Sequence, residues 1–412
     1  MDDHPVRITV DDDLRRSRLT VFFRLLLAIP HLVWLAAWTA LALVAAVLNW
    51  FAVLFTTQSP RPFHRFLTAY VRYSTHVAAF IGLAANPFPG FVGDDTRYPV
   101  KLDMPELAPQ RRLVTGFKLV LAVPVLLLAG IFGGDAFSYG GLAGAASFLA
   151  WFAALATARM PSGLRNVLVW CIGYSAQAAA YLFSLTDRYP TSDPNEHVRE
   201  YPPEHPVRLH LEDDGVRSRL TVFFRPFLAI PHLILLSLWG YAIALAAFVG
   251  WFAALAIGRL PDPLHRLSAA YLSYQAQVYA YLFLLANPFP GFVVPEYPLT
   301  IEFGPPVQQH RLLTLFRLVL ALPALLLATL LMYLLGVISI LGWFAALATR
   351  RMPTGMRNGG AAAIRYISQM SAYVLLVTPE YPHSTPSLAT ARAPVPEYEA
   401  YIPPPPEPEA AA

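Results

Sequence analysis

The chain has 412 residues, of which 56% are apolar and 14% are charged, and 28 arginines with two lysines dominate a formal net charge of +4. This composition and the positive mean hydropathy exclude an ordinary soluble protein with a fully hydrated surface. The sequence has no basic stripe with interleaved aromatic residues, so it predicts a lipid bilayer rather than a nucleic acid as the partner.

The chain is a tandem duplication whose halves are doubled again. Residues 5–92 return at 206–293 without insertion or deletion, and the tripeptide Trp-Phe-Ala occurs four times, which indicates four units of roughly 100 residues. We predict a first half over residues 1–200 and a second half over 201–382, followed by a disordered proline-rich tail over 383–412. The four predicted units are residues 5–95, 97–190, 206–293 and 296–382.

Each unit begins with a short segment in which apolar and polar residues alternate. In the first unit Val6, Ile8 and Val10 alternate with Arg7 and Thr9, and the later units repeat the pattern. A period of two predicts a half-buried strand. Because a strand cannot lie unpaired in lipid, we expect all four strands outside the membrane on one side, where they can pair with one another.

A long apolar run without charged residues follows each strand. Three of these runs have 31 or 32 residues, at 25–55, 226–257 and 318–349, whereas about 20 residues span the hydrocarbon core. A proline near the start of each run predicts a bend in the helix. The repeated tryptophan near its end predicts an aromatic belt at the far interface.

A second, more polar helix is predicted after each tryptophan, and it returns the chain to the strand side. The fold class is therefore mainly α: a polytopic helical membrane protein with eight crossings, in the cell membrane, with a cytoplasmic N-terminus and strand layer. Two crossings per unit would make the repeats parallel. Two alternatives stay open. The long runs could be re-entrant hairpins, which the glycine-rich segment 130–144 favours, or an interfacial second helix could leave four crossings.

Three segments carry a resemblance to a known family. They are LTVFFRLLLAIPHL at residues 19–32, AYLFSLTDRYP at 180–190 and WFAALAIGRLP at 251–261. These segments resemble the DUF4389 family of bacterial membrane proteins, and the resemblance extends over nearly all of residues 5–382. It implies a membrane location and no assigned activity. The arginine-rich and alanine-rich composition is similar to that of actinobacterial proteins.

One set of candidate functional residues lies on the second helices. A spacing of three and four residues places them on one helical face, where a polar side chain inside a membrane must face protein or water. Hydrogen bonding between helices and a pseudo-symmetric polar cavity are the two interpretations. The residues are Tyr73, His76, Gln177, Gln277 and Gln369.

A second set is the basic residue six positions before each bending proline. Arginine or lysine beside aromatic residues suits the headgroup layer, so we predict contact with anionic lipid headgroups, with ordinary interfacial anchoring as the alternative. The residues are Arg24, Lys118, Arg225 and Arg317.

The sequence predicts no catalytic, cofactor or metal site. Cys171 is the single cysteine, the histidine spacing does not suit a metal, and no phosphate-binding loop or nucleophile motif is present. We therefore expect a membrane protein that is not an enzyme and has a structural, assembly or lipid-interacting role. The alternatives are a transporter or channel and, after it, an intramembrane or lipid-modifying enzyme. The proline-rich tail is a candidate site for an unknown protein partner.

Overall fold

The computed structural model describes residues 4–93, 98–137, 139–291 and 297–388. Within these ranges the chain is mainly helical, as predicted. The first half and the linker after it contain β1 (Arg7–Val10), α1 (Arg18–Phe22), α2 (Arg24–Thr56), α3 (Arg61–Ile81), β2 (Val100–Asp103), α4 (Arg112–Gly116), α5 (Lys118–Phe132), α6 (Gly141–Thr157), α7 (Ser162–Leu182) and α8 (Pro194–His197). The second half contains β3 (Val207–Leu211), α9 (Arg219–Ile257), α10 (Asp262–Leu282), β4 (Leu299–Phe303), α11 (Arg311–Leu315), α12 (Arg317–Thr349) and α13 (Thr354–Val374).

The predicted strands are confirmed, and they pair within each half rather than in one common layer. β1 is antiparallel to β2 and β3 is antiparallel to β4. In β2 the alternation separates buried Val100 and Leu102 from exposed Lys101 and Asp103. The sheets are therefore half-buried, as a period of two requires.

In the part of the chain that the structure describes, three helices are long and apolar enough to cross a bilayer, judged by length and composition: α2, α9 and α12. At 33 residues, α2 and α12 are each about 50 Å long. The bending prolines lie inside continuous helices, at Pro30, Pro124, Pro231 and Pro323. Only the run of the second unit is interrupted, between α5 and α6, where Gly133 and Gly141 have positive φ.

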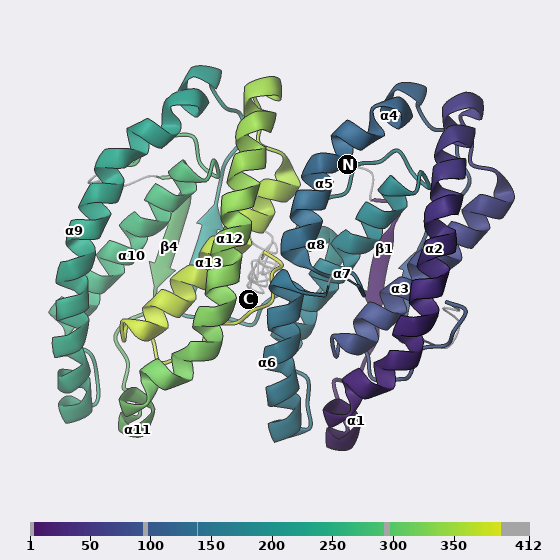
Figure 1. Cartoon of the computed structure of the whole chain (residues 1–412). Helices are drawn as coiled ribbons and strands as arrows, with labels where there is room; N and C mark the ends of the chain where they lie inside the picture. Colours follow the sequence, from purple (N-terminus) through teal and green to yellow (C-terminus); the bar gives the residue numbers. More distant parts are fainter. Residues whose placement is uncertain (1–3, 94–97, 138, 292–296, 389–412) are drawn as a thin grey trace, which may run out of the picture.

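The two long runs of each half are antiparallel. Trp50 at the end of α2 donates to the carbonyl of Thr115 in α4, and Trp151 at the end of α6 donates to the carbonyl of Val21 in α1. Figure 1 shows α1 and α4 at opposite ends of the first half. Each run extends from one end of the half to the other. The hairpin alternative is therefore wrong, and neighbouring repeats are inverted rather than parallel.

The fold has three layers. In Figure 1 the long runs α9, α12, α5–α6 and α2 form the front layer. The second helices α10, α13, α7 and α3 pack behind them, and the strands pack against these second helices. The halves meet where α12 contacts α5 and α6. The second helices are consequently the most enclosed elements, although they are more polar in sequence.

The strands lie level with the middle of the helices. Arg72, in the middle of α3, donates from Nε to the carbonyl of Leu102 in β2 at 3.2 Å. Near it on α3, the hydroxyls of Tyr70 and of Thr39, in the middle of α2, are 2.9 Å apart. The expected division into a strand end and a tryptophan end is therefore wrong. The strands lie behind the helix layer, and tryptophans lie at both of its ends.

Residues 383–388, which the sequence assigns to the tail, are packed between the halves. Thr385 and Ser387 are both 1% exposed, Arg365 donates to their two carbonyls, and the Ser387 hydroxyl donates to the carbonyl of Glu200. The predicted boundary before residue 383 is therefore wrong, because these residues bond to the linker between the halves. The remainder of the predicted tail, 389–412, lies outside the described residues.

Candidate functional site

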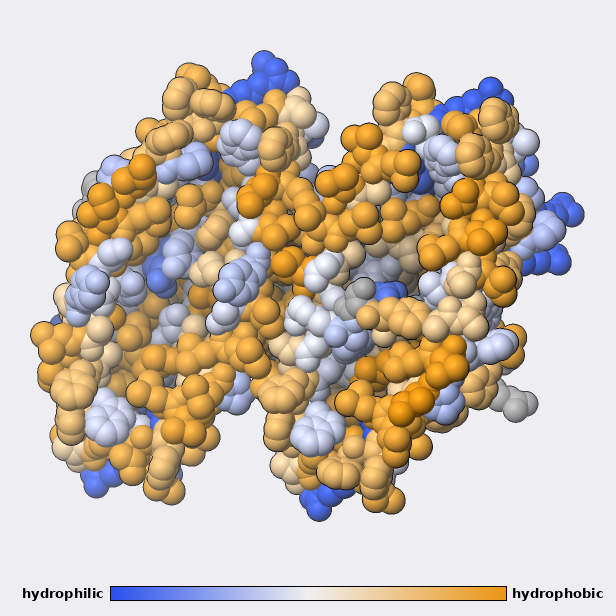
Figure 2. All heavy atoms as spheres, in the orientation of Figure 1, coloured by the Kyte–Doolittle hydropathy of each residue, from blue (hydrophilic) through white to orange (hydrophobic). Residues whose placement is uncertain are grey.

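The exposed side of the long-helix layer is an apolar surface, which we call the outer face. In the most apolar windows of α2, α9 and α12, only 22%, 17% and 39% of the residues are buried. Leu25, Leu41 and Leu238 are 69%, 63% and 63% exposed. Figure 2 shows this side covered mainly by apolar residues, with hydrophilic residues at its upper and lower ends. So large an apolar surface indicates contact with a membrane or a partner.

The strands lie on the opposite side, which we call the strand face, and their exposed residues are hydrophilic. It includes the exposed Lys101 and Asp103 of β2, Arg208 of β3 and Glu302 of β4. These side chains point away from the second helices because their neighbours along each strand are buried against them. The apolar and hydrophilic surfaces therefore lie on opposite faces of a slab.

An apolar cavity of about 860 Å³ lies between the halves, at the junction of α6 and α12. Phe152 and Leu326 line it from the outer face, the buried Tyr366 lines it from the interior, and Tyr381 and His383 line it from the segment after α13. A cavity of this size and lining is suited to an apolar chain.

Four exposed arginines border the outer face, one at the start of each unit's long run. Arg18 donates from Nη2 to the carbonyl of Ala156, in the last turn of α6, at 2.9 Å. This places a cation at the negative end of a helix. The set is Arg18, Arg112, Arg219 and Arg311. The sequence analysis missed these residues, although Arg18 and Arg219 open the repeated RLTVFFR segment.

The basic residues expected at headgroup level are buried instead. Arg24, with 1% of its surface exposed, donates from Nη1 to the carbonyls of Phe80 at 2.7 Å and Ala85 at 2.9 Å, and its guanidinium lies 4.5 Å from the Phe80 ring. The equivalent caps are Lys118 on Ser184 and Thr186, Arg225 on Tyr281 and Ala286, and Arg317 on Tyr373 and Thr378. The expectation of headgroup contact is wrong for all four, because each cation caps the C-terminal end of a second helix.

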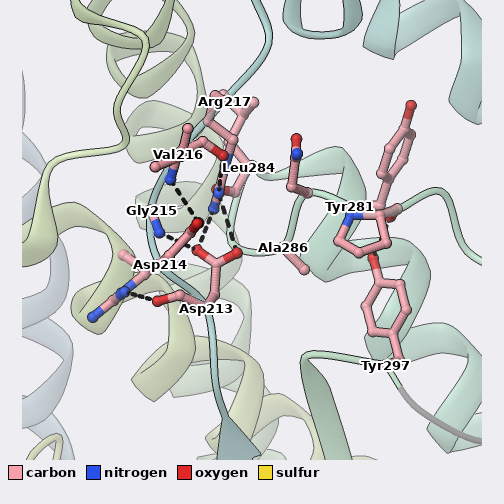
Figure 3. Close-up of polar contacts among 12 residues, drawn as sticks. Asp213, Asp214, Gly215, Val216, Arg217, Tyr281, Leu284, Ala286 and Tyr297 are labelled. Atoms are coloured by element: carbon pink, nitrogen blue, oxygen red, sulfur yellow. Dashed lines mark hydrogen bonds and ion pairs between the residues drawn. The ribbon is translucent and has the colours of Figure 1, made fainter.

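A second buried arginine reinforces this cap in the odd units, and the sequence analysis missed it. Arg217 donates from Nε and Nη2 to the carbonyl of Leu284, and Nη2 also pairs with Asp213 at 2.7 Å (Figure 3). Leu284 has a positive φ of 64° where the chain leaves α10. Arg16 does the same at Leu83 in unit one, and Gln110 and Gln309 take this place in the even units. The signal was an aspartate four residues before an arginine, repeated 201 residues apart.

The two buried glutamines of the predicted polar face bond to backbone. Gln177 donates from Nε2 to the carbonyl of Val6 at 3.0 Å and accepts from the Thr191 amide at 2.9 Å. Gln369 makes the equivalent bonds to Val207 and His383, at 3.1 and 3.2 Å. Each glutamine therefore joins the start of a strand to the chain that follows its own helix, and these bonds are not the hydrogen bonds between helices that the sequence analysis expected.

The other members of that set have different surroundings. The hydroxyl of Tyr73 lies 2.7 Å from Nδ1 of His31 on α2. His76 is buried, with its ring 4.5 Å from that of Tyr98. Gln277 is half-buried on α10. Four helices thus carry the five residues.

Titratable groups are buried in the linker between the halves. Burial raises the pKa of Asp193, whose carboxylate accepts from the Asn195 amide and from Asn358 at 2.7 Å. Burial lowers the pKa of His197 to about 4, while its Nε2 lies 3.0 Å from the carbonyl of Thr191. Within the described ranges no group of three or more His, Cys, Asp or Glu residues is placed to hold a metal ion.

The comparisons with known proteins identify one family. The family model described as "Domain of unknown function (DUF4389)" matches residues 18–92, 112–192, 219–293 and 311–385. These four matches confirm both the resemblance and the division into four repeated units. No curated protein and no solved structure matches the chain.

Proposed function

The chain belongs to the DUF4389 family, and we propose that it is a lipid-binding membrane protein that lies flat in one leaflet. In this arrangement the outer face enters the hydrocarbon and the strand face stays in water. The role is structural or lipid-interacting, and no residue is assigned to catalysis. The observation that carries the proposal is the position of the apolar and hydrophilic surfaces on opposite faces of the slab.

The level of the strands favours a flat position over a spanning one. If α2 stood across the bilayer, Thr39 at its midpoint would lie near the bilayer centre, and β2 is level with it. Exposed Lys101 and Asp103 would then lie in hydrocarbon, where each charge costs about 3 kcal/mol and strand edges have no partner. A flat position avoids both costs.

The exposed arginines support the same position. Helices that lie in the interface sink about 5–10 Å below the headgroups. At that depth Arg18, Arg112, Arg219 and Arg311 would be level with the lipid phosphates at the border of the outer face. Arginine near an anionic leaflet contributes about 1 kcal/mol. We therefore assign the protein to the cytoplasmic leaflet of the cell membrane, with its strand face and N-terminus in the cytoplasm.

A transporter or channel is the second candidate, because α2, α9 and α12 are each long enough to cross a bilayer. In that arrangement the strand faces of neighbouring copies would have to enclose water, since they cannot face lipid. The two candidates therefore differ in the depth of the outer face and of the strands.

Spin labels in vesicles separate the candidates. Leu41 and Leu238, near the middles of α2 and α9, report the depth of the outer face, and Lys101 and Glu302 report that of the strand face. The flat arrangement predicts outer-face labels about 5–10 Å below the phosphates and strand labels open to a water-soluble relaxation reagent. Outer-face labels about 15 Å deep, at the bilayer centre, would refute it.

A further inference from the structure

Three arginines line a depression at one end of the long-helix layer, namely the exposed Arg15 and Arg159 and the buried Arg16, and Arg18 lies beside it. The depression has a volume of about 410 Å³ and lies where α1 meets the end of α6. Arg15 and Arg159 are joined by an antiparallel backbone bridge, so their side chains start from neighbouring strands of backbone. Arg18 lies just beyond Ser17. The lining residues are Arg15, Arg16, Ser17, Asn86, Thr157, Ala158 and Arg159.

Polar groups around the depression remain available to a ligand. Among the described residues, the side chains of Arg15 and Arg159 have neither a hydrogen bond nor an ion pair, and Ser17 makes no capping bond to α1. Asn86 uses its Oδ1 to accept from Arg24, which leaves its amide nitrogen to donate elsewhere. Two guanidinium groups, a hydroxyl and an amide N–H form a donor set that suits an anion.

In the described part of the chain, neither nearby carboxylate forms an ion pair with Arg15 or Arg159. Asp12 is paired with the buried Arg16 at 2.6 Å. Asp13 accepts from the backbone amide of Arg15 at 2.9 Å and is exposed. Neighbouring like charges repel, so Arg15 and Arg159 are stabilised if an anion lies between them.

Unit two fills the corresponding place with its own carboxylate. Arg111 precedes α4 as Ser17 precedes α1, and Asp187 follows α7 as Asn86 follows α3. Arg111 pairs through Nε with Asp187 at 3.0 Å. The fold therefore holds an anion at this place in unit two, where the protein supplies it, and leaves the place open in unit one.

The second half carries corresponding residues. Ser218 and Asn287 occupy the places of Ser17 and Asn86, 201 residues later. The bridge here joins Val216 to Arg351, and Arg350 stands where the first half has Ala158. The second half therefore has Val216 in place of Arg15 on one strand of the bridge and Arg350 in place of Ala158 on the other. Apart from the buried Arg16 and Arg217, each half therefore has three arginines here, counting Arg18 and Arg219.

We propose that each of these two places, one bounded by Arg15, Ser17, Asn86 and Arg159 and the other by its second-half counterparts, binds one phosphate group of an anionic phospholipid. The planar guanidinium fork matches phosphate oxygens in geometry and charge. Leu19 and Phe22, beside the first place, are 71% and 60% exposed and lead onto the outer face, where acyl chains would lie. That the phosphate group belongs to a lipid rests on the proposed flat position of the protein in the membrane.

Native mass spectrometry of the full chain with phosphatidylglycerol or phosphatidylcholine tests the sites. The main variant is Asn86→Asp with Asn287→Asp, which gives each odd unit the carboxylate of unit two. The second is Arg15→Gln with Arg159→Gln. The matched control removes two exposed cations of the strand face, Lys101→Gln with Arg208→Gln. The Asp variant should bind phosphatidylglycerol about tenfold to 100-fold more weakly at both sites, the Arg variant at one, and the control should bind as wild type.

Flotation with phosphatidylcholine vesicles, measured in parallel, keeps the two proposals apart. Failure of the wild type to float with these vesicles overturns the membrane proposal. Wild-type flotation of the variants together with lost phosphatidylglycerol binding supports the phosphate sites. Unchanged phosphatidylglycerol binding in the variants, or an equal loss in the control, overturns them. A further outcome is that inorganic phosphate raises the melting temperature of the wild type but not that of the Asp variant. If the wild type then binds no phosphatidylglycerol, the sites bind free phosphate and the lipid is not their ligand.

Discussion

The indole nitrogen of Trp50 donates a hydrogen bond to the backbone carbonyl of Thr115 at 2.8 Å, which joins the end of one long run to the start of the next. The other three repeated tryptophans make the same bond within their halves, from Trp151 to Val21, from Trp251 to Thr314 and from Trp343 to Val222. Each half is therefore closed by a reciprocal pair of bonds between inverted units.

Trp50→Phe should lower the free energy of unfolding by about 1–2 kcal/mol, because it removes the N–H donor and part of a half-buried ring. Thermal unfolding in detergent measures the effect. Phe51→Leu is the control, since that ring is 47% exposed on the outer face and its loss should change stability by less than about 0.5 kcal/mol. Equal stability of the two variants would contradict a bonding role for the indole.

Arg24→Met should destabilise the protein by about 3 kcal/mol, because the carbonyls of Phe80 and Ala85 lose a charged donor inside the protein. Arg24→Lys should retain about half of this stability, since Lys118 fills the equivalent place in unit two. Denaturant unfolding of both variants against wild type gives the comparison. If the lysine variant is as unstable as the methionine variant, the positive charge at residue 24 does not stabilise the protein.

Gln177→Leu should free the start of β1, because one side chain bonds both Val6 and Thr191. Hydrogen exchange of the β1 amides should become at least tenfold faster, which corresponds to about 1.4 kcal/mol. Gln277→Leu, at the half-buried equivalent position in unit three, is the matched variant and should have the smaller effect on its own half. Normal exchange with a loss of ion flux would instead favour the transporter candidate.

Acid should destabilise the junction between the halves through His197. Burial lowers the pKa of His197 from 6.5 to about 4, so the folded state binds this proton less readily than the unfolded state. Neutral His197 therefore does not reduce the free energy of unfolding above pH 6.5. As the pH falls towards about 4, the free energy of unfolding decreases by up to about 3 kcal/mol. Burial lowers the pKa of His4 to about 4 as well.

The stability of wild type and His197→Gln, measured by denaturant unfolding between pH 7 and pH 4, tests this pH dependence. Glutamine can still donate to the carbonyl of Thr191 and does not titrate. The free energy of unfolding of the variant should therefore depend less on pH. His4→Gln with His197→Gln should reduce this dependence further. Curves of equal slope for all three proteins would rule out these histidines as the cause.

The elements were predictable from the sequence because each depends on a local pattern. Alternation of Val6, Ile8 and Val10 predicted β1, and the run at residues 25–55 predicted α2. The direction and tilt of α2 were not predictable, because its apolar pattern is the same whether the helix stands or lies and whichever way it points. Hydropathy therefore predicted a membrane environment for α2, but it did not predict the orientation of the helix.

The candidate site was predicted only in part, for a physical reason visible in one segment. Arg18 and Arg24 have the same chemistry and lie six residues apart, but Arg18 begins α1 and Arg24 begins α2. Arg24 reaches carbonyls of α3 and Arg18 stays exposed, a difference that depends on packing between helices. The partner of Gln177 is likewise Val6, 171 residues away, which no local spacing reveals.

Labelling of single cysteines at the two ends of α2 tests the central claim most directly. In a Cys171→Ala background, Asp13→Cys and Gln58→Cys place exposed thiols at opposite ends of this helix. A membrane-impermeant maleimide applied to intact cells and to inverted vesicles reports the side of each thiol. The flat arrangement predicts that both react in inverted vesicles and neither in intact cells. Labelling of the two thiols from opposite sides would contradict it.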